Sequence, residues 1–452
     1  MITRLKNHLL QDGLRAKTLR GVLISIGLAG GSHVLRFISN ILLARLLFPE
    51  AFGLMVLVQV VISGLEMLST VGLRAAVMQN PRGDTPEFLS TIWTIQVLRG
   101  VALWLIAWAC SPWVADFYGQ PILIDILPVA TFYLLINGLH PSRVLLVERN
   151  MQLGRHALLT LIAQGIALMV MAILAVYLQS VWALVAGYLV SPLLLLVLFN
   201  LYLPGHRDRL LLERQSLRDI FKLGKFLIFS SMASYALMQG DRAILGRLIP
   251  VELLGLYGIG MALATVPTIL AGKVMDSVLF PLYRMRPPSA SAENQAKIFK
   301  LRRLVIGATV TLLTGLALLG PLVVELIYDD RYLLAGPITV LLATANVSAV
   351  IALGTMNVAL IQGDALRFTV MTIANAVCQI GLLLVAALHL GIIGAALAIG
   401  LAPLLTYPLQ ALFLHRYGNW DAKGDAGMLV LGYAGTGLAC WLHWDGLMQL
   451  LP

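Results

Sequence analysis

Ionisable side chains inside otherwise apolar stretches are the residues of this sequence that could do chemistry. Each such charge costs roughly 2.5–3.5 kcal/mol at the centre of a membrane, so it must face a partner, the protein interior or a water-filled cavity. We expect the cations Arg36, Arg99, Arg242 and Lys273 to line one central cavity, with Asn40 on the same helix face as Arg36. Such a cavity suits an anionic phosphate or diphosphate, because a guanidinium fork can bind two phosphate oxygens.

Acids inside the same stretches leave two interpretations open. Glu66, Asp241 and Asp276 lie in apolar segments, and Asp276 follows Lys273 at a spacing that places both on one helix face. If the charges pair internally, as Lys273 with Asp276 would, they are structural. If they stay available, the three acids are candidates for binding a coupling ion. Glu66, the lone acid of its segment, is then either a counter-ion or a proton or cation site.

These segments are long enough to cross a membrane. The 452 residues are 59% hydrophobic and 12% charged, about half the charged fraction of roughly 25% in soluble proteins. Apolar runs longer than about 18 residues without polar alternation predict transmembrane helices rather than barrel strands. A weaker thirteenth stretch lies at 426–443. We predict twelve spans, at 22–48, 51–73, 88–110, 122–146, 157–178, 181–203, 221–249, 251–283, 302–328, 337–361, 369–389 and 391–414.

Lysine and arginine gather on one side of the predicted membrane. Of 32 such residues, 25 lie in the amino-terminal arm and alternate loops, while the opposite loops hold only Arg331. This bias predicts a cytoplasmic amino terminus and places Ser216 and Ser289 in cytoplasmic loops. The net charge of +10 therefore reflects topology. Because no basic patch is interleaved with aromatic residues, we expect no nucleic-acid partner.

The sequence also repeats itself over a long period. LARLLFPEAFGL at 43–54 aligns without a gap on LGRLIPVELLGL at 245–256, an offset of 202 residues. Six helices per repeat predict two parallel six-helix lobes around a central cavity, related by a pseudo-two-fold axis along the membrane normal. The expected parts are a basic cytoplasmic arm at 1–20, an N-lobe at 21–203, a cytoplasmic linker at 204–220, a C-lobe at 221–414 and a C-terminal segment at 415–452 with one possible extra span.

Enzyme signatures are missing from the sequence. It contains no G-x-x-x-x-G-K-[ST] loop for ATP and no H-E-x-x-H motif, and its eight histidines do not cluster with acids at ligand spacing. We therefore expect no enzymatic activity, no cofactor and no metal site. Three prolines inside spans, Pro267, Pro403 and Pro408, are expected to kink or break their helices.

Three stretches resemble a known family. LRFISNILLARLLFPEAFGL at 35–54, DRAILGRLIPVELLGLYGIG at 241–260 and PWVADFYGQP at 112–121 are similar to segments of Wzx-type polysaccharide flippases. These proteins belong to the multidrug/oligosaccharidyl-lipid/polysaccharide exporter superfamily. The resemblance covers nearly the whole chain up to about residue 414.

The resemblance implies alternating access in the bacterial inner membrane. The cargo would be an oligosaccharide repeat unit linked to undecaprenyl diphosphate, for exopolysaccharide, O-antigen or capsule synthesis. Membrane lipids and polysaccharide polymerase or assembly proteins would be partners, and Arg36, Arg99 and Arg242 would correspond in depth to the family's cavity arginines. Two alternatives remain: a drug/cation antiporter of the same superfamily, and a non-transporting scaffold of a polysaccharide assembly complex.

Overall fold

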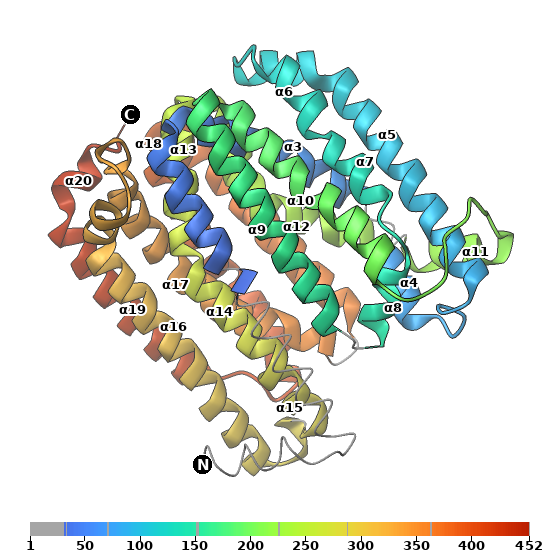
Figure 1. Cartoon of the computed structure of the whole chain (residues 1–452). Coiled ribbons are helices and arrows are strands. Elements are labelled where there is room, and N and C mark those ends of the chain that lie inside the picture. Colours follow the sequence, from blue (N-terminus) through green and yellow to red (C-terminus); the bar gives the residue numbers. More distant parts are fainter. Residues whose placement is uncertain are drawn as a thin grey trace, which may run out of the picture. The chain divides into compact units, whose positions relative to one another are not determined.

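Helices make up all the regular secondary structure in the described part of the chain, which confirms the all-α class (Figure 1). The computed structural model describes residues 31–451 except 33, 70–71, 151–152, 225–226, 287 and 362–363. The predicted basic arm lies outside the described residues. The first predicted span is described only from residue 31 and is helical at 34–46.

Contacts among the described residues divide the chain into two units, which are treated separately. Unit 1 holds the described residues up to Phe48 together with Val61–Ile228, and unit 2 holds Pro49–Val60 together with the described residues from Phe229 on. Helix α3 (Pro49–Leu68) thus contributes its first turns to unit 2 and its remainder to unit 1. The later helices up to the start of unit 2 are α4 (Leu73–Gln79), α5 (Pro86–Tyr118), α6 (Leu123–Ala130), α7 (Phe132–Gly138), α8 (Arg143–Arg149), α9 (Leu153–Leu178), α10 (Val181–Tyr202) and α11 (Arg214–Gly224).

Unit 2 contains the longest helices. Its central member is α17 (Ala335–Ile361), which is buried over most of its length against α13, α16, α18 and α19. The remaining elements are α12 (Leu227–Leu248), α13 (Val251–Ala264), α14 (Val266–Val274), the π-helix η1 (Met275–Leu279), α15 (Phe280–Met285), η2 (Pro288–Ala290), α16 (Ala292–Ile327), η3 (Asp330–Tyr332), α18 (Ala365–Arg416), α19 (Ala422–Leu442) and α20 (Trp444–Met448).

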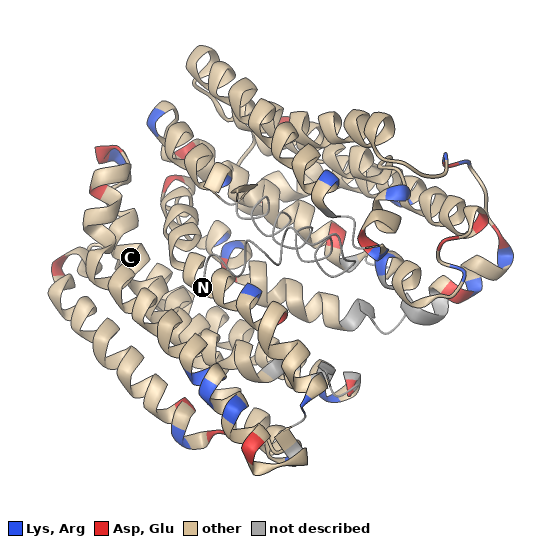
Figure 2. Ribbon diagram, turned by 60° about the horizontal axis from the view of Figure 1, so that its bottom comes forward, with Lys and Arg blue, Asp and Glu red and all other residues tan. Residues whose placement is uncertain are grey.

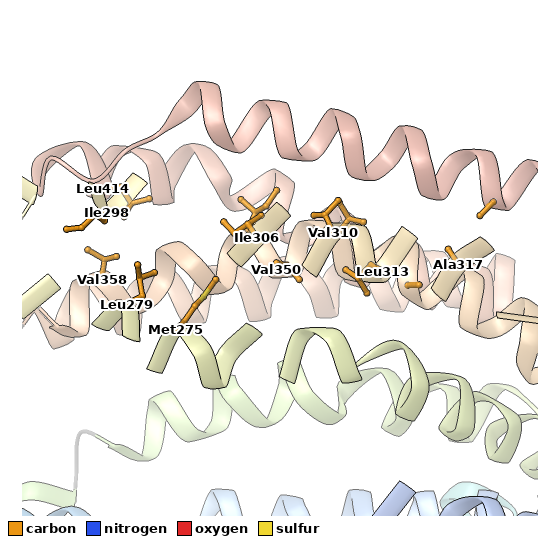
Figure 3. Close-up of a cluster of buried hydrophobic side chains, with 14 of the residues drawn as sticks. Met275, Leu279, Ile298, Ile306, Val310, Leu313, Ala317, Val350, Val358 and Leu414 are labelled. Atoms are coloured by element: carbon orange, nitrogen blue, oxygen red, sulfur yellow. The ribbon is translucent and has the colours of Figure 1, made fainter. Parts of the chain in front are cut away.

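The main apolar cluster of unit 2 lies between η1, α16 and α17. Met275, Ile306, Leu313 and Val350 are each at most 2% exposed and point into it (Figure 3). Close packing of such side chains, rather than intrinsic propensity, supplies most of the stability of helices that also contact lipid.

Eight described helices are long and apolar enough to cross a membrane, or nine if the bent pair Leu123–Gly138 and Arg143–Arg149 is one span. One of the eight, α18, contains a break at Gly391, whose φ of 52° favours glycine. That break falls where the predicted spans 369–389 and 391–414 meet. The weak thirteenth stretch forms α19, which packs on α16 and α17. Figure 2 shows charged residues mainly at loops and helix ends, with long uncharged helical stretches between them.

The expected proline breaks are present at one position and absent at two. α13 ends at Ala264 and α14 restarts at Val266, so the expected break at Pro267 is present. Pro403 and Pro408 lie inside helical backbone, and the only non-helical residue within α18 is Gly391. Neither of these two prolines breaks the helix, because the backbone groups that a proline leaves unpaired can be satisfied by neighbouring helices and side chains.

Within unit 2, the first turns of α3 pack directly on α13. A Cβ atom placed on Gly53 would lie 1.8 Å from the Val251 carbonyl oxygen, and one placed on Gly255 would lie 2.1 Å from the Pro49 carbonyl oxygen. The two glycines are equivalent in the sequence repeat, and so are Pro49 and Val251. One turn further, Val56 contacts Gly258 at the same offset of 202. Because the contacts advance together along both helices, α3 and α13 run in the same direction here.

Candidate functional site

A polar cavity of about 290 Å³ lies inside unit 1, among α3, α5 and α7. Its apolar wall includes leucines of α5 and α7. Its polar lining consists of Glu66, Gln96, Arg99, Asn137 and His140. The structure thus brings together Glu66 and Arg99, two of the residues that the sequence predicts as site residues.

Two glycines let the walls of this cavity approach each other. A Cβ atom on Gly100 of α5 would lie 2.7 Å from the Leu134 carbonyl oxygen, and one on Gly138 of α7 would lie 2.7 Å from the Gln96 carbonyl oxygen. Larger residues at either glycine would force α5 and α7 apart. Glycine at both positions therefore sets the distance between the polar groups on the two helices.

Arg99 is held at the carboxyl end of α3. Its Nε donates to the Ser69 hydroxyl at 3.0 Å, and its Nη2 donates to the Glu66 backbone carbonyl at 3.2 Å. A cation is favourable there because the unpaired carbonyls of a helix end carry partial negative charge. Arg99 therefore has a structural role in unit 1 besides any role toward a ligand.

The Glu66 carboxylate belongs to a polar network. It interacts electrostatically with Arg99, and Asn137 pairs with both Glu66 and the Tyr133 hydroxyl. The Tyr133 and Tyr188 rings lie 4.7 Å apart between centroids. The charge of the exposed Arg36 acts on both tyrosines, so Arg36 lies near this network as well.

Sequence reasoning missed three members of the network, Asn137, Tyr133 and Tyr188. They carry no charge, so the search for ionisable residues inside spans passed over them. Tyr133 and Asn137 are four residues apart in an apolar stretch, and that spacing was the available signal. Asn40, which we predicted as a cavity residue, is half-buried on the helix at 34–46.

In unit 2, Asp241 is buried and Arg242 is half-buried. The Tyr257 hydroxyl donates to Asp241 Oδ2 at 2.5 Å, while Asp241 Oδ1 is buried without a hydrogen-bond partner among the described residues. Arg242 Nη1 donates to Gln239 Oε1 at 3.0 Å. The neighbouring acid and base of the sequence thus have different partners.

Lys273 and Asp276 are both exposed, and no ion pair joins these two described residues. Of the two interpretations left open by the sequence, the internal pairing of Lys273 with Asp276 is therefore not the one found. The reason is η1, which begins at Met275 and widens the helix where Asp276 lies. Residues three apart then no longer share one face. Single π-turns inside α-helices occur frequently at functional sites.

A chain of uncharged polar groups joins α17 to α18 within unit 2. The Thr355 hydroxyl donates to Gln410 at 2.8 Å, Gln410 donates to Thr406 at 3.3 Å, and Thr406 donates to Asn375 at 3.3 Å. All four side chains are less than 10% exposed. They satisfy one another's hydrogen bonds, as buried polar groups must.

Comparison with known proteins gives a consistent family. The family model described as "polysaccharide biosynthesis protein" matches residues 42–337. The chain is 21% identical to the teichuronic acid biosynthesis protein TuaB of Bacillus subtilis (strain 168), over 66% of this chain and 62% of that protein. It is 22% identical to the succinoglycan biosynthesis transport protein ExoT of Rhizobium meliloti (strain 1021), over 74% and 67% of the two chains. The lipopolysaccharide biosynthesis protein WzxC of Escherichia coli (strain K12) is 20% identical, over 71% and 65%. The matches therefore span about two thirds, or slightly less, of these relatives' lengths.

Solved structures share the fold. The lipid II flippase MurJ in an inward closed conformation aligns with a TM-score of 0.68 at 13% identity, over 94% of this chain and 99% of that one. An inward-facing multidrug resistance transporter of the MATE family aligns with a TM-score of 0.57 at 14% identity, over 86% and 96%. The resemblance to polysaccharide flippases seen in the sequence is thereby confirmed at the level of family and fold.

Proposed function

The chain belongs to the polysaccharide biosynthesis protein family, and on that premise we propose that it is a lipid-linked oligosaccharide flippase. It moves an undecaprenyl-diphosphate-linked repeat unit across the bacterial inner membrane by alternating access, for exopolysaccharide, O-antigen or capsule synthesis. One observation carries this proposal: the same chain matches the family over residues 42–337 and aligns with the fold of a lipid flippase over 94% of its length.

The proposed architecture is two parallel six-helix lobes, at 21–203 and 221–414, around a cavity that opens to one side at a time. Its support is the sequence repeat and the parallel packing of α3 on α13, in which repeat-equivalent Gly53 and Gly255 make reciprocal contacts. In this arrangement the amino terminus and the 204–220 linker face the cytoplasm, which the loop distribution of Lys and Arg supports.

The proposed substrate site uses cations from both lobes. Arg36, Arg99, Arg242 and Lys273, with Asn40, bind the diphosphate, while the sugars occupy the polar lumen and the lipid tail stays in the bilayer. Arg36 and Lys273 are exposed, so their charged groups are accessible to an anion. A diphosphate would supply the opposite charge only transiently, which suits a cavity that must also release its cargo.

Glu66, Asp241 and Asp276 are the proposed ion-coupling residues. Asp241 supports this role because it is buried and one of its oxygens has no described hydrogen-bond partner. Glu66 supports it by lining the unit 1 cavity beside Arg99. Energy would then come from an ion gradient or the membrane potential, with no bound cofactor.

Complementation of a strain that lacks its own repeat-unit flippase tests the proposal. The wild-type chain should restore surface polysaccharide, and Arg36→Ala and Arg242→Ala should abolish export at equal membrane abundance. Lysine at these positions should restore export in part, because it keeps the charge but loses the guanidinium fork. Arg286→Ala, at an exposed cation outside the predicted spans, is the control.

Other outcomes separate the alternatives. Folded alanine variants at all four cations that export normally would remove the proposed substrate site. A wild-type chain that fails to restore polysaccharide but confers resistance to cationic drugs would indicate a drug/cation antiporter. Polysaccharide assembly that requires the protein, with no movement of lipid-linked repeat units in reconstituted vesicles, would indicate a scaffold.

A further inference from the structure

The segment at 203–218, here called the strap, is bound along unit 1. The Leu211 amide donates to the Thr94 hydroxyl at 3.0 Å, and the Glu213 amide donates to the Thr91 hydroxyl at 3.1 Å. At the start of the strap, Arg143 donates to the Leu203 carbonyl at 3.0 Å. These hydrogen bonds fix one face of the strap against the rest of unit 1, and the opposite face, here called the outer face, points away from it.

The acidic side chains in and beside the strap point inward and accept hydrogen bonds from other parts of unit 1. Asp208 accepts from the Ser142 amide at 3.0 Å. Glu213 accepts two hydrogen bonds from Arg82, at 2.8 and 3.0 Å. Just beyond the strap, Asp219 accepts from Asn80 at 2.9 Å. Each of these carboxylates thus has a partner in unit 1, and none forms an ion pair with a strap arginine among the described residues.

The outer face of the strap is basic and apolar. Leu210 is 73% exposed and Leu212 is 52% exposed, in a segment otherwise rich in charge. None of the exposed strap arginines forms an ion pair with any residue in the described part of the chain. These arginines are Arg207, Arg209, Arg214 and Arg218.

We propose that this outer face binds anionic phospholipid headgroups of the leaflet at which α10 ends. The strap begins directly after Tyr202, the last residue of that membrane-spanning helix, so it starts at the membrane surface. Arginines at this depth contact lipid phosphates, and the two exposed leucines bury in the boundary between headgroups and acyl chains. The opposite charge of an anionic leaflet favours lipid over a basic or neutral partner. This inference depends on membrane insertion and not on the flippase proposal.

A lipid titration of the purified full-length protein in neutral detergent tests this inference. Dioctanoyl phosphatidylglycerol should raise the Tm, and dioctanoyl phosphatidylcholine should not, because a ligand that binds the folded state stabilises it. The variant with Arg207→Gln, Arg209→Gln, Arg214→Gln and Arg218→Gln should need on the order of tenfold more phosphatidylglycerol for the same shift. Added salt should remove most of the difference between this variant and the wild type.

A matched control removes four exposed cations from unit 2 instead: Arg286→Gln, Lys300→Gln, Arg416→Gln and Lys423→Gln. It should keep the wild-type titration. Leu210→Ser with Leu212→Ser should weaken the response while keeping its dependence on salt. Because all these side chains point outward, each variant should keep the wild-type Tm without lipid.

Three results would overturn the proposal. The strap variant could retain the full wild-type response to phosphatidylglycerol. The strap variant and the unit 2 control could weaken equally, which would mean that total charge alone matters. The strap variant could also retain the lipid response but lose a protein that copurifies with the wild-type chain, which would assign the outer face to a protein partner.

Discussion

At the scale of single residues, the ion pair between Arg302 and Asp425 should matter most for stability. The two side chains are 1% and 3% exposed, and Arg302 Nη2 donates to both Asp425 oxygens, at 2.6 and 2.8 Å. Asp425→Ala would leave a buried, unpaired guanidinium. We expect it to lower the free energy of unfolding by about 3–5 kcal/mol, measured by denaturant titration in detergent.

An exposed ion pair on the same helix is the control for that measurement. Lys297 and Glu293 pair in the first turns of α16, where both are exposed. Glu293→Gln should leave the free energy of unfolding nearly unchanged, because water screens an exposed ion pair. Replacing both buried partners, as Arg302→Met with Asp425→Leu, should cost less than Asp425→Ala alone. Equal losses for Asp425→Ala and Glu293→Gln would show that Arg302 reaches water or another partner.

A second residue-scale prediction concerns acid sensitivity. Burial opposes ionisation of Asp421, but hydrogen bonds from Arg303 and the Gly424 amide outweigh it and hold the pKa of Asp421 below its usual value. Stability from this carboxylate is complete above its unfolded-state pKa and is lost as the pH falls through the lower folded-state pKa. Asp421→Asn should therefore reduce the fall in Tm between about pH 5 and pH 3. An equal fall in Tm in the wild type and in Asp421→Asn would contradict a lowered pKa of Asp421 in the folded state.

The sequence alone identified isolated charges but not their partners. Glu66 and Arg99 were visible because a charge in an apolar span is costly. Their companion Asn137 was not, because an amide has no such cost signature and lies on a different helix. Arg302 stands at the very start of the predicted span 302–328, whereas α16 begins at Ala292 and Arg302 lies well inside it, and its partner Asp425 is 123 residues further along the chain. Pairing at such separations is fixed by tertiary packing.

At the scale of elements, the reciprocal glycine contact of α3 with α13 should tolerate no side chain. Gly53→Ala places a Cβ where the Val251 carbonyl oxygen lies, so the helices must separate. We expect a loss of about 1–3 kcal/mol in the free energy of unfolding. Gly165→Ala in α9 is the matched control, because a Cβ there meets no atom within 4 Å. It should be neutral or stabilising by up to about 1 kcal/mol. Equal effects of the two variants would contradict the close packing.

Element positions followed well from apolar runs, whereas the local geometry inside a span did not. The predicted span 251–283 coincides with the bounds of one membrane-spanning stretch, Val251–Tyr283. Inside it, however, lies the π-helix at Met275–Leu279, which separates Lys273 from Asp276. A period of 3.6 residues assumed along a whole span cannot reveal one widened turn. The break of α18 at Gly391 does fall between two predicted spans, but hydropathy carries no information on the positive φ that makes it.

At the scale of the whole molecule, the side of the membrane that each loop faces is predicted by the distribution of charge rather than by packing. Insertion responds to Lys and Arg near the ends of spans, largely regardless of whether they later pair with acids. Arg303 contributes to the bias although Asp421 binds it in the fold. The distribution of 32 cations therefore predicts an orientation that contacts within either unit do not determine.

Cysteine labelling of intact cells tests this orientation, and burial decides which positions are informative. Ser216 is buried and hydrogen-bonded to Glu213, so a cysteine there would resist labelling on either side of the membrane. The exposed residue Gln215 is therefore used in place of Ser216, and the exposed residue Ala290 is used in place of Ser289. In a background without the native cysteines, Gln215→Cys and Ala290→Cys should react with a membrane-impermeant maleimide only after the cells are opened. Asp330→Cys, beside the single cation of the opposite loops, should react in intact cells. Labelling of Gln215→Cys or Ala290→Cys in intact cells would reverse the assigned orientation, and it would place the amino terminus outside the cytoplasm.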